Sequence, residues 1–340
     1  MIERPVSPIK VIYTSSVLFI FLLIISFCSL YTGAVKIHIK DMLNAIFGIG
    51  HNAESIKLIL FKIRLPRILL AGIVGFSLSL GGVIFQAILR NPLADPFILG
   101  VSSGSAFGAI IGILIGLDYK MGIPMMAFCG AIITIIMVIM IGKKERDSES
   151  STIILAGVIV NAFFSAIIMF FISCSYDERL HSMLSWLYGD LSLSCYTYSF
   201  IIAPVAICSF TILYILARHL NIITAGEEVA LQLGVDVEML KWLCLVVVSL
   251  NVGIAVSFSG LIGFVGLIVP HLCRMIFGSD HRILIPTASI GGAIFLIAAD
   301  TFSRTVIAPN ELPVGVVTAS IGAPFFIYLL KSRGSGWSQS

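Results

Sequence analysis

The residues that could do chemistry in this chain are few, and their spacing suits ion pairing better than catalysis. The sequence contains no G-x-x-x-x-G-K-[ST] phosphate loop, no H-E-x-x-H zinc motif and no paired C-x-x-C, and its six histidines are scattered. Carboxylates are almost absent from the long apolar stretches, which argues against a proton relay through a membrane. Neither a nucleophile with its base nor a set of metal ligands is visible. The charged motifs that remain are Arg64-Leu-Pro-Arg67, Asp300 with Arg304 at i, i+4, and Glu227-Glu228.

Residues 218–241 lie between two long apolar runs and are far more polar than either. Thr224 and Glu227 have the spacing of a capping box, which predicts a helix of about two turns after Thr224. Gly234 can end this helix because glycine tolerates a positive φ. Asp236 can then cap the helix that continues into the next apolar run. The segment therefore predicts a short helix within a loop at one membrane face.

Composition assigns the chain to the membrane proteins. Hydrophobic residues make up 58% of the 340 residues and charged residues only 11%, whereas soluble domains contain about 25% charged residues. The net charge of +3 is small and spread along the chain, so it gives no case for binding nucleic acid. The expected fold is all-α and polytopic.

Hydropathy predicts ten transmembrane helices, most of them near the length of about 20 residues that a bilayer requires. Eight fall at about residues 11–30, 68–89, 123–141, 152–173, 198–217, 242–258, 283–300 and 313–330. The third contains Gly100 to Gly116, and a shorter eighth helix begins within residues 259–271 and ends before Arg274. An even number of spans places both termini on one side. Arg4, Lys10, Lys331 and Arg333 favour the cytoplasmic side.

Two segments outside the spans have patterns of their own. An amphipathic helix in the outer interface is predicted from Ile39, Met42, Leu43, Ile46 and Phe47, which share one face. Residues 174–195 form an outer segment with a short helix at about residues 183–188. Cys174 and Cys195 bound this segment and could form a disulfide that closes about 22 residues and contributes roughly 3 kcal/mol.

Glycines recur every four residues along the third span. They are Gly100, Gly104, Gly108, Gly112 and Gly116. Small residues at this spacing allow a neighbouring helix backbone to approach closely, so the pattern predicts a helix-packing surface.

Four long stretches resemble the FecCD family of ABC-transporter permeases. They are residues 64–109, 226–234, 259–282 and 298–330, which contain RLPRILLAG, GEEVALQLG, SGLIGFVGLIVPH and NELPVG. The resemblance implies a single permease domain over residues 1–340, with type II ABC importer architecture and a coupling segment at 218–241. It also implies a multi-pass homodimer in the bacterial cytoplasmic (inner) membrane, surrounded by lipid. Two ATP-binding subunits would dock below it and a substrate-binding protein above. ATP and Mg would be bound by the ATPase, so no cofactor and no catalytic or metal site is expected in this chain.

The resemblance also assigns roles to particular residues. ATPase coupling is assigned to Glu227, Glu228, Ala230, Leu233 and Gly234, with the small residues letting the helix sit in a cleft of the ATPase. A cytoplasmic gate is assigned to Ser150, Ser151 and Thr152, for which simple helix capping is an equal alternative. Docking of acidic residues from the binding protein is assigned to Arg64, Arg67 and Arg304, which we expect near solvent.

Alternatives remain open at this point. An ion-coupled secondary transporter would need charges at a midplane site, and residues 260–266 could form a helix break without supplying those charges. Within the family, an iron(III)-siderophore is the first expectation for the substrate, with vitamin B12 (a corrinoid) or haem as alternatives.

Overall fold

The computed structural model describes residues 7–33, 35, 37–46, 53–142 and 150–332, and every regular element among them is helical. The helices are α1 (Pro8–Tyr31), α2 (Ile39–Ile46), α3 (Ala53–Leu58), α4 (Leu65–Ile88), α5 (Val101–Leu114), α6 (Gly122–Gly142), α7 (Ser150–Cys174), α8 (Asp177–Tyr188), α9 (Tyr196–Ile215), α10 (Ala217–Ala225), α11 (Glu227–Gln232), α12 (Val237–Ser259), α13 (Val265–Phe277), α14 (His281–Ser303) and α15 (Val314–Ser332). A π-helical turn, η1 (Ile59–Arg64), joins α3 to α4, so residues 53–88 form one continuous helical rod.

The expected membrane spans are present in the described part of the chain. Seven helices are long and apolar enough to cross a bilayer: α1, the rod that ends in α4, α6, α7, α9, α12 and α14. Three shorter apolar helices, α5, α13 and α15, occupy the positions of the other three predicted spans. The prediction of an all-α polytopic fold is confirmed.

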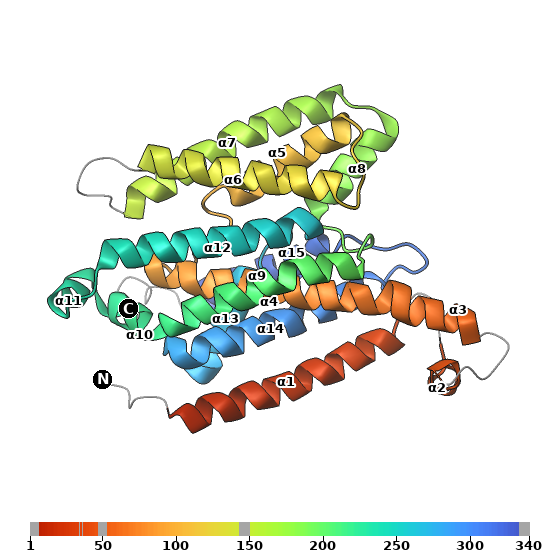
Figure 1. Cartoon of the computed structure of the whole chain (residues 1–340), viewed down its shortest axis with the longest axis horizontal. Helices are drawn as coiled ribbons and strands as arrows, with labels where there is room; N and C mark the ends of the chain where they lie inside the picture. The colour runs from red at the N-terminus through yellow and green to blue at the C-terminus, as the bar shows by residue number, and fades with distance from the viewer. Residues whose placement is uncertain (1–6, 34, 36, 47–52, 143–149, 333–340) are drawn as a thin grey trace.

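The bundle is organised around α4, most of whose residues are buried. One side of α4 packs on α14 and α13, and another packs on α12 and α9. Helices α5, α6 and α7 form a separate layer that reaches α4 through α12, and α1 lies on the opposite side against α14 (Figure 1). Helix α1 begins at the same end of the bundle as α11 (Figure 1).

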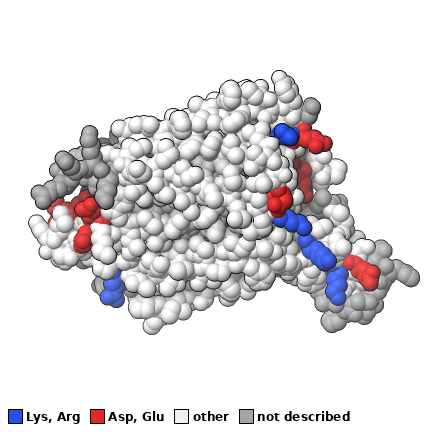
Figure 2. Space-filling model, turned by 45° about the horizontal axis from the view of Figure 1, so that its top comes forward, with Lys and Arg blue, Asp and Glu red and all other residues white. Residues whose placement is uncertain are grey.

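Charged side chains gather at the two ends of the bundle and leave a wide uncharged band between them on the visible face (Figure 2). Such a band is what the hydrocarbon layer requires, because a charge at its centre is costly. The α10–α11 end is the cytoplasmic end in the predicted topology, and the other end, with α2, α3 and α8, is the outer end.

Glycines set the closest contacts of α4. A Cβ added to Gly75 would collide with the carbonyl oxygen of Gly292 in α14, and one added to Gly292 would collide with the carbonyl of Gly75. A Cβ on Gly82 would likewise meet the carbonyl of Gly266 in α13. Backbone therefore touches backbone at these points, as small residues allow in membrane helices.

The predicted glycine surface of the third span is confirmed in part. Gly104 and Gly108 press against the backbone of α6, at Gly130 and Met126, and Gly112 makes an ordinary contact with α6. Gly100 and Gly116 lie outside α5 with left-handed backbones, at φ 74° and 75°, and nothing lies near Gly116. The stripe is shorter than predicted because α5 spans only Val101–Leu114.

Several predicted boundaries are corrected. The predicted capping box is wrong. Thr224 lies in the last turn of α10, and its hydroxyl donates to the carbonyl of Asn221, while Gly226 occupies the N-cap of α11. Helix α8 is longer than expected, and α13 continues past Arg274. Helix α2 confirms the amphipathic helix, although Phe47 and the charged loop 143–149 lie outside the described residues.

We expect Gly75→Val to destabilise the bundle strongly, because the added side chain would force α4 and α14 apart. Overpacking of this kind costs about 1–3 kcal/mol or more. Gly263→Val is the matched control, since nothing lies within 4 Å of a Cβ added there. Thermal unfolding of both purified variants in the same detergent checks the difference. Equal unfolding temperatures would show that the Gly75–Gly292 contact is not close in solution.

Candidate functional site

The cytoplasmic end carries the short helix α11 in the position the sequence predicts. Gly234 has φ 77° and turns the chain after the helix, as expected. The carboxylate of Asp236 accepts a hydrogen bond from the backbone N–H of Met239 at 2.9 Å, so it caps α12 as predicted. Glycine at 234 is favoured because left-handed backbone costs other residues about 1–2 kcal/mol.

Two of the residues assigned to ATPase contact are engaged within the chain instead. Ala230 is completely buried inside the protein, so the expectation that it sits in a cleft of a partner is wrong. The carboxylate of Glu227 lies 2.7 Å from Nζ of Lys241 in α12, although it remains partly exposed. These contacts attach α11 to the bundle, which is a structural role that the spacing alone did not reveal.

The exposed face of α11 and the start of α12 combines aliphatic side chains with carboxylates. Glu228, Leu233 and Gly234 are exposed, as their assigned role needs. Sequence reasoning missed three further exposed residues: Val229 at 43%, Leu231 at 62% and Met239 at 67%. Exposed aliphatic side chains beyond the apolar band indicate a protein contact surface. A signal was available, since these aliphatic residues interrupt a segment that is far more polar than the apolar runs on either side.

Asn221 fastens α10, which leads into α11, to the start of α14. Its amide nitrogen donates to Asp280 at 2.8 Å, and its amide oxygen accepts from the backbone N–H of His281 at 2.8 Å. Burial alone would raise the pKa of the Asp280 carboxyl, but hydrogen bonds from Arg282 and Asn221 outweigh it and lower that pKa to about 2. The carboxyl therefore stays ionised, and the stability it contributes is lost only as pH falls toward 2.

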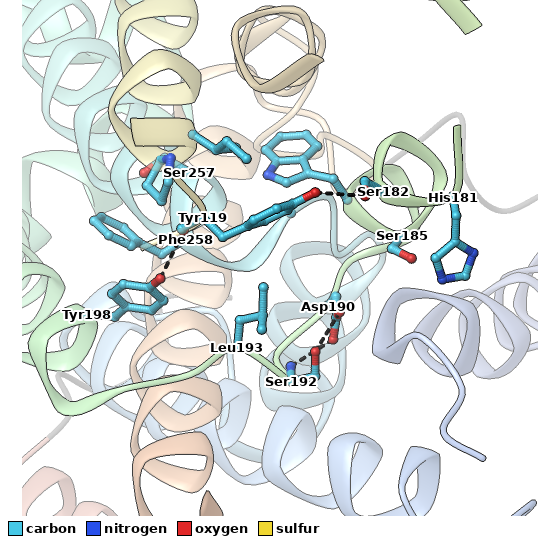
Figure 3. Close-up of a pocket in the computed structure, with 14 residues that line it drawn as sticks. Tyr119, His181, Ser182, Ser185, Asp190, Ser192, Leu193, Tyr198, Ser257 and Phe258 are labelled. Carbon is cyan, nitrogen blue, oxygen red and sulfur yellow. Dashed lines mark hydrogen bonds between the residues drawn. The ribbon is translucent and has the colours of Figure 1, made fainter. Parts of the chain in front are cut away.

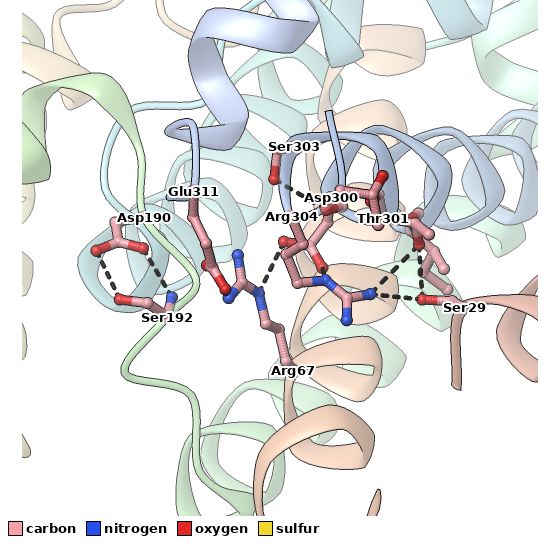
Figure 4. A network of polar contacts seen from close by, with 11 residues as sticks. Ser29, Arg67, Asp190, Ser192, Asp300, Thr301, Ser303, Arg304 and Glu311 are labelled. Carbon is pink, nitrogen blue, oxygen red and sulfur yellow. Dashed lines mark hydrogen bonds and ion pairs between the residues drawn. The ribbon is translucent and has the colours of Figure 1, made fainter. Parts of the chain in front are cut away.

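The outer end carries a buried ionic network (Figure 4). Nε of Arg67 donates to Asp300 at 2.9 Å, and its terminal nitrogen donates to Glu311 at 2.6 Å. Nε of Arg304 lies 3.0 Å from the other oxygen of Asp300. The predicted i, i+4 pairing of Asp300 with Arg304 is confirmed. One carboxylate therefore holds two guanidinium groups, from α4 and from the end of α14.

The third arginine holds the end of α1. Arg64 donates to the carbonyl oxygens of Leu30 and Tyr31 at 2.7 and 2.8 Å, and also to that of Val35. The last carbonyls of a helix lack intrahelical partners and carry partial negative charge, so a cation stabilises them. Arg64 therefore ties α1 to the rod that contains α4.

The expectation that these arginines stand near solvent is wrong. Arg64, Arg67 and Arg304 are each 4–5% exposed. Apart from the local contacts of Arg304 with Asp300 and Thr301, their partners come from segments far away in sequence, which local spacing could not show. In the network, Glu311 is the carboxylate that reaches solvent, with a side chain 38% exposed. The assignment of the arginines to docking stays a prediction.

A cavity of about 310 Å³ opens beside this end, between α8 and the starts of α6 and α9. Tyr119, Ser182, Asp190, Ser192 and Tyr198 point toward it (Figure 3). The hydroxyl of Tyr119 donates to Ser182 at 2.7 Å, and the hydroxyl of Ser192 donates to Asp190 at 2.7 Å. These polar groups already have hydrogen-bond partners within the chain, so they do not by themselves indicate a bound ligand.

The remaining predicted residues lie where the topology places them. Ser150, Ser151 and Thr152 form the first turn of α7, and Thr152 is half-buried. Cys174 and Cys195 are free thiols, so the suggested disulfide is absent. No group of three or more potential metal-ligating residues occurs in the described ranges.

Comparison with known families decides the identity of the fold. The model of the FecCD transport family matches residues 20–332, nearly the whole length of the chain. The chain belongs to the FecCD transport family.

Several named relatives match the sequence of this chain over most of their length. The chain is 43% identical to the cobalamin import system permease protein BtuC of Halobacterium salinarum, over 82% of this chain and 75% of BtuC. It is 37% identical to the hemin transport system permease protein HmuU of Yersinia pestis, over 92% and 93% of the two chains. A solved structure, described as a metal-chelate type ABC transporter in an inward-facing conformation, superposes with a TM-score of 0.83 at 32% identity. It covers 94% of this chain and 98% of the other. The FecCD chain is therefore an ABC-transporter permease that crosses the membrane several times.

We expect Asp300→Ala to destabilise the permease by about 3–5 kcal/mol, because it leaves two buried guanidinium groups with one carboxylate fewer. Glu311→Gln should cost at most about 1 kcal/mol, because its side chain reaches solvent. Thermal unfolding of both variants in detergent measures the contrast. If Glu311→Gln proves as harmful as Asp300→Ala, Asp300 is not the centre of the network.

Proposed function

We propose that this permease forms the membrane path of an ATP-driven importer for a metal chelate, with an iron(III)-siderophore as the first substrate to test. The relatives named above carry cobalamin and hemin, and the superposed transporter is of metal-chelate type. All three cargoes are metal ions enclosed in an organic chelator. A corrinoid or haem is the alternative within the same class. The observation that carries the proposal is the match over residues 20–332 to this family of transporters.

The exposed aliphatic residues of α11 and of the start of α12 form the proposed binding surface for the ATPase. Leu231, Leu233 and Met239 are more than half exposed beyond the apolar band, and Glu228 adds an acidic group beside them. Val229 extends the same surface, which we call the α11 tip. Burial of such side chains against a partner is favourable by about 25 cal/mol per Å² of apolar area. ATP and Mg would bind to that partner, and its movements would reach the bundle through the Glu227–Lys241 and Asn221–Asp280 contacts.

The ionic network at the outer end is the proposed docking site of the binding protein. The three arginines and two carboxylates sum to one positive charge, since +3 and −2 give +1. Glu311 is the exposed member of the network and pairs with Arg67. An acidic residue of a binding protein would compete with Glu311 for that guanidinium. Docking would then exchange one ion pair for another, and long-range attraction would act mainly on the association rate.

The whole chain would act as one permease domain, paired with a second copy, with both termini in the cytoplasm. The substrate path would run between the two copies. Residues 150–152, at the cytoplasmic start of α7, would form the inner gate between them. The even number of predicted spans would place both termini on one side, and the basic residues near the two ends favour the cytoplasmic side.

Energy coupling separates this function from that of a secondary transporter. Membrane vesicles containing the permease, its ATPase and its binding protein should take up an iron(III)-siderophore when ATP is enclosed. Uptake should persist when an ionophore collapses the proton gradient and should stop when ATP is depleted. The reverse pattern would exclude the proposal, and uptake of cobalamin or haem alone would change only the substrate.

Leu231→Asp should weaken ATPase binding about tenfold or more, because burial of one leucine is worth about 1.5–3 kcal/mol. Gln232→Asp is the matched control, since it adds the same charge at the next exposed position. The affinity of purified ATPase for permease in nanodiscs measures both. Equal affinities for Leu231→Asp, Gln232→Asp and the wild type would remove the α11 tip from the interface.

Glu311→Gln should strengthen docking of the cognate binding protein, because it removes the carboxylate that competes for Arg67. The gain should shrink as salt rises, since the contact is electrostatic. Binding kinetics across a salt series, with wild type and Glu311→Asp as controls, provide the measurement. If Glu311→Gln leaves both affinity and salt dependence unchanged, the arginine network is not the docking site.

Cysteine introduced as Thr152→Cys should cross-link between the two copies in one nucleotide state and not in the other, because a gate must part. Cross-linking is measured on gels with and without a non-hydrolysable ATP analogue. An equal yield in all states would leave helix capping as the role of this residue.

A further inference from the structure

An apolar groove of about 330 Å³ opens on the side of the bundle, away from both polar ends. Helix α1 forms one wall and α9 the other, while α4 and α14 form the floor. Its position is marked by Leu23, Gly72, Ala203, Ile207 and Ile297. Among the residues that line it, Ser26 is the one with a polar side chain.

The depth of the groove follows from the helix rise of about 1.5 Å per residue. The lining residues 22–26 lie roughly 8–14 Å from the outer end of α1 at Tyr31. Residues 293–297 lie roughly 9–15 Å from the end of α14 at Ser303. Residues 203–207 lie roughly 11–17 Å from the start of α9 at Tyr196. Three helices therefore place the groove at one depth, mostly in the outer half of a hydrocarbon layer about 30 Å thick.

The surroundings at this depth are lipid. The apolar stretch of α1 has no buried residue within its most hydropathic window, although α1 is a membrane span and one side of it packs on α14, so hydrocarbon chains must contact its exposed side. Water would find almost no partner in a groove lined this way, and an unfilled groove would forfeit dispersion contacts. A hydrocarbon chain satisfies both conditions.

Two basic residues lie on the helix that forms the floor of the groove, closer than the groove to the outer end of the bundle. Lys57 and Lys62 are exposed, and Lys62 lies ten residues before Gly72 on the continuous helix 53–88. The hydroxyl of Tyr196, at the start of α9, donates to the carbonyl of Phe61, which brings Lys62 close to the outer end of the α9 wall. Ammonium groups at this level would meet the headgroups of lipids and attract negative ones.

We propose that this groove is a binding site for an anionic phospholipid of the outer leaflet, whose acyl chain lies between α1 and α9 and whose phosphate meets Lys62 and Lys57. The bound chain would connect α1, which packs mainly on α14, to the α9 side of the bundle. The groove shares no lining residue with either partner surface and does not depend on the transported substrate.

The test uses the full-length permease in nanodiscs made from equal parts of phosphatidylglycerol and phosphatidylcholine. Native mass spectrometry after release from the nanodisc counts the retained lipids and identifies their headgroups. Two variants fill the groove from opposite walls, Ala203→Trp on α9 and Leu23→Trp on α1. Leu23 is 55% exposed, so that variant keeps the packing of the bundle. Cys208→Trp is the matched control on an exposed, non-lining position of α9.

We expect the wild type and Cys208→Trp to retain phosphatidylglycerol, and both groove-filling variants to lose it. Lys57→Gln with Lys62→Gln should keep a bound lipid but lose the preference for phosphatidylglycerol. Absence of retained lipid on the wild type would overturn the proposal, as would equal retention by Leu23→Trp and Cys208→Trp. An unchanged headgroup preference in the double lysine variant would overturn the assignment of the lysines.

Discussion

The backbone contact between Gly75 and Gly292 is the constraint on which the arrangement of this permease depends. Inside a bilayer, burial of apolar side chains does not drive helices together, because lipid chains are equally apolar. Close packing must supply the attraction, and glycine allows the closest packing. Helices α4 and α14 meet at this contact, and their outer ends carry Arg67 and Asp300. The buried ion pair can form because the two backbones are already held side by side.

The same helix pair links the two ends of the molecule. At its cytoplasmic start, α14 is hydrogen-bonded to Asn221 through Asp280, which accepts, and the backbone N–H of His281, which donates. Helix α10 leads from Asn221 directly into α11. A displacement of the α11 tip would therefore act on a helix whose other end closes the outer network. Both proposed partner surfaces are connected to α14, one through Asn221 at its start and the other through Asp300 near its end, although they lie on opposite sides of the membrane.

Sequence reasoning predicted the features that depend on short-range patterns. The apolar runs located the spans, Gly234 located a turn, and Asp236 located a cap, because each requires only neighbouring residues. It failed where a long-range contact decides the outcome. Arg67 was expected near solvent, but its partners lie 233 and 244 residues further along the chain. The small size of Ala230 suggested a cleft in the ATPase. A small residue fits a cleft within its own chain equally well, and the sequence does not distinguish the two.

The central claim is that opposite ends of one bundle meet different partners, and hydrogen–deuterium exchange of the permease in nanodiscs tests it most directly. Exchange would be followed by mass spectrometry with each partner added separately. Adding the ATPase should slow exchange over residues 226–239 and leave residues 305–312 unchanged. Adding the binding protein should slow exchange over residues 305–312 and leave residues 226–239 unchanged. Protection of the same segment by both partners, or of neither segment by either, would contradict this account.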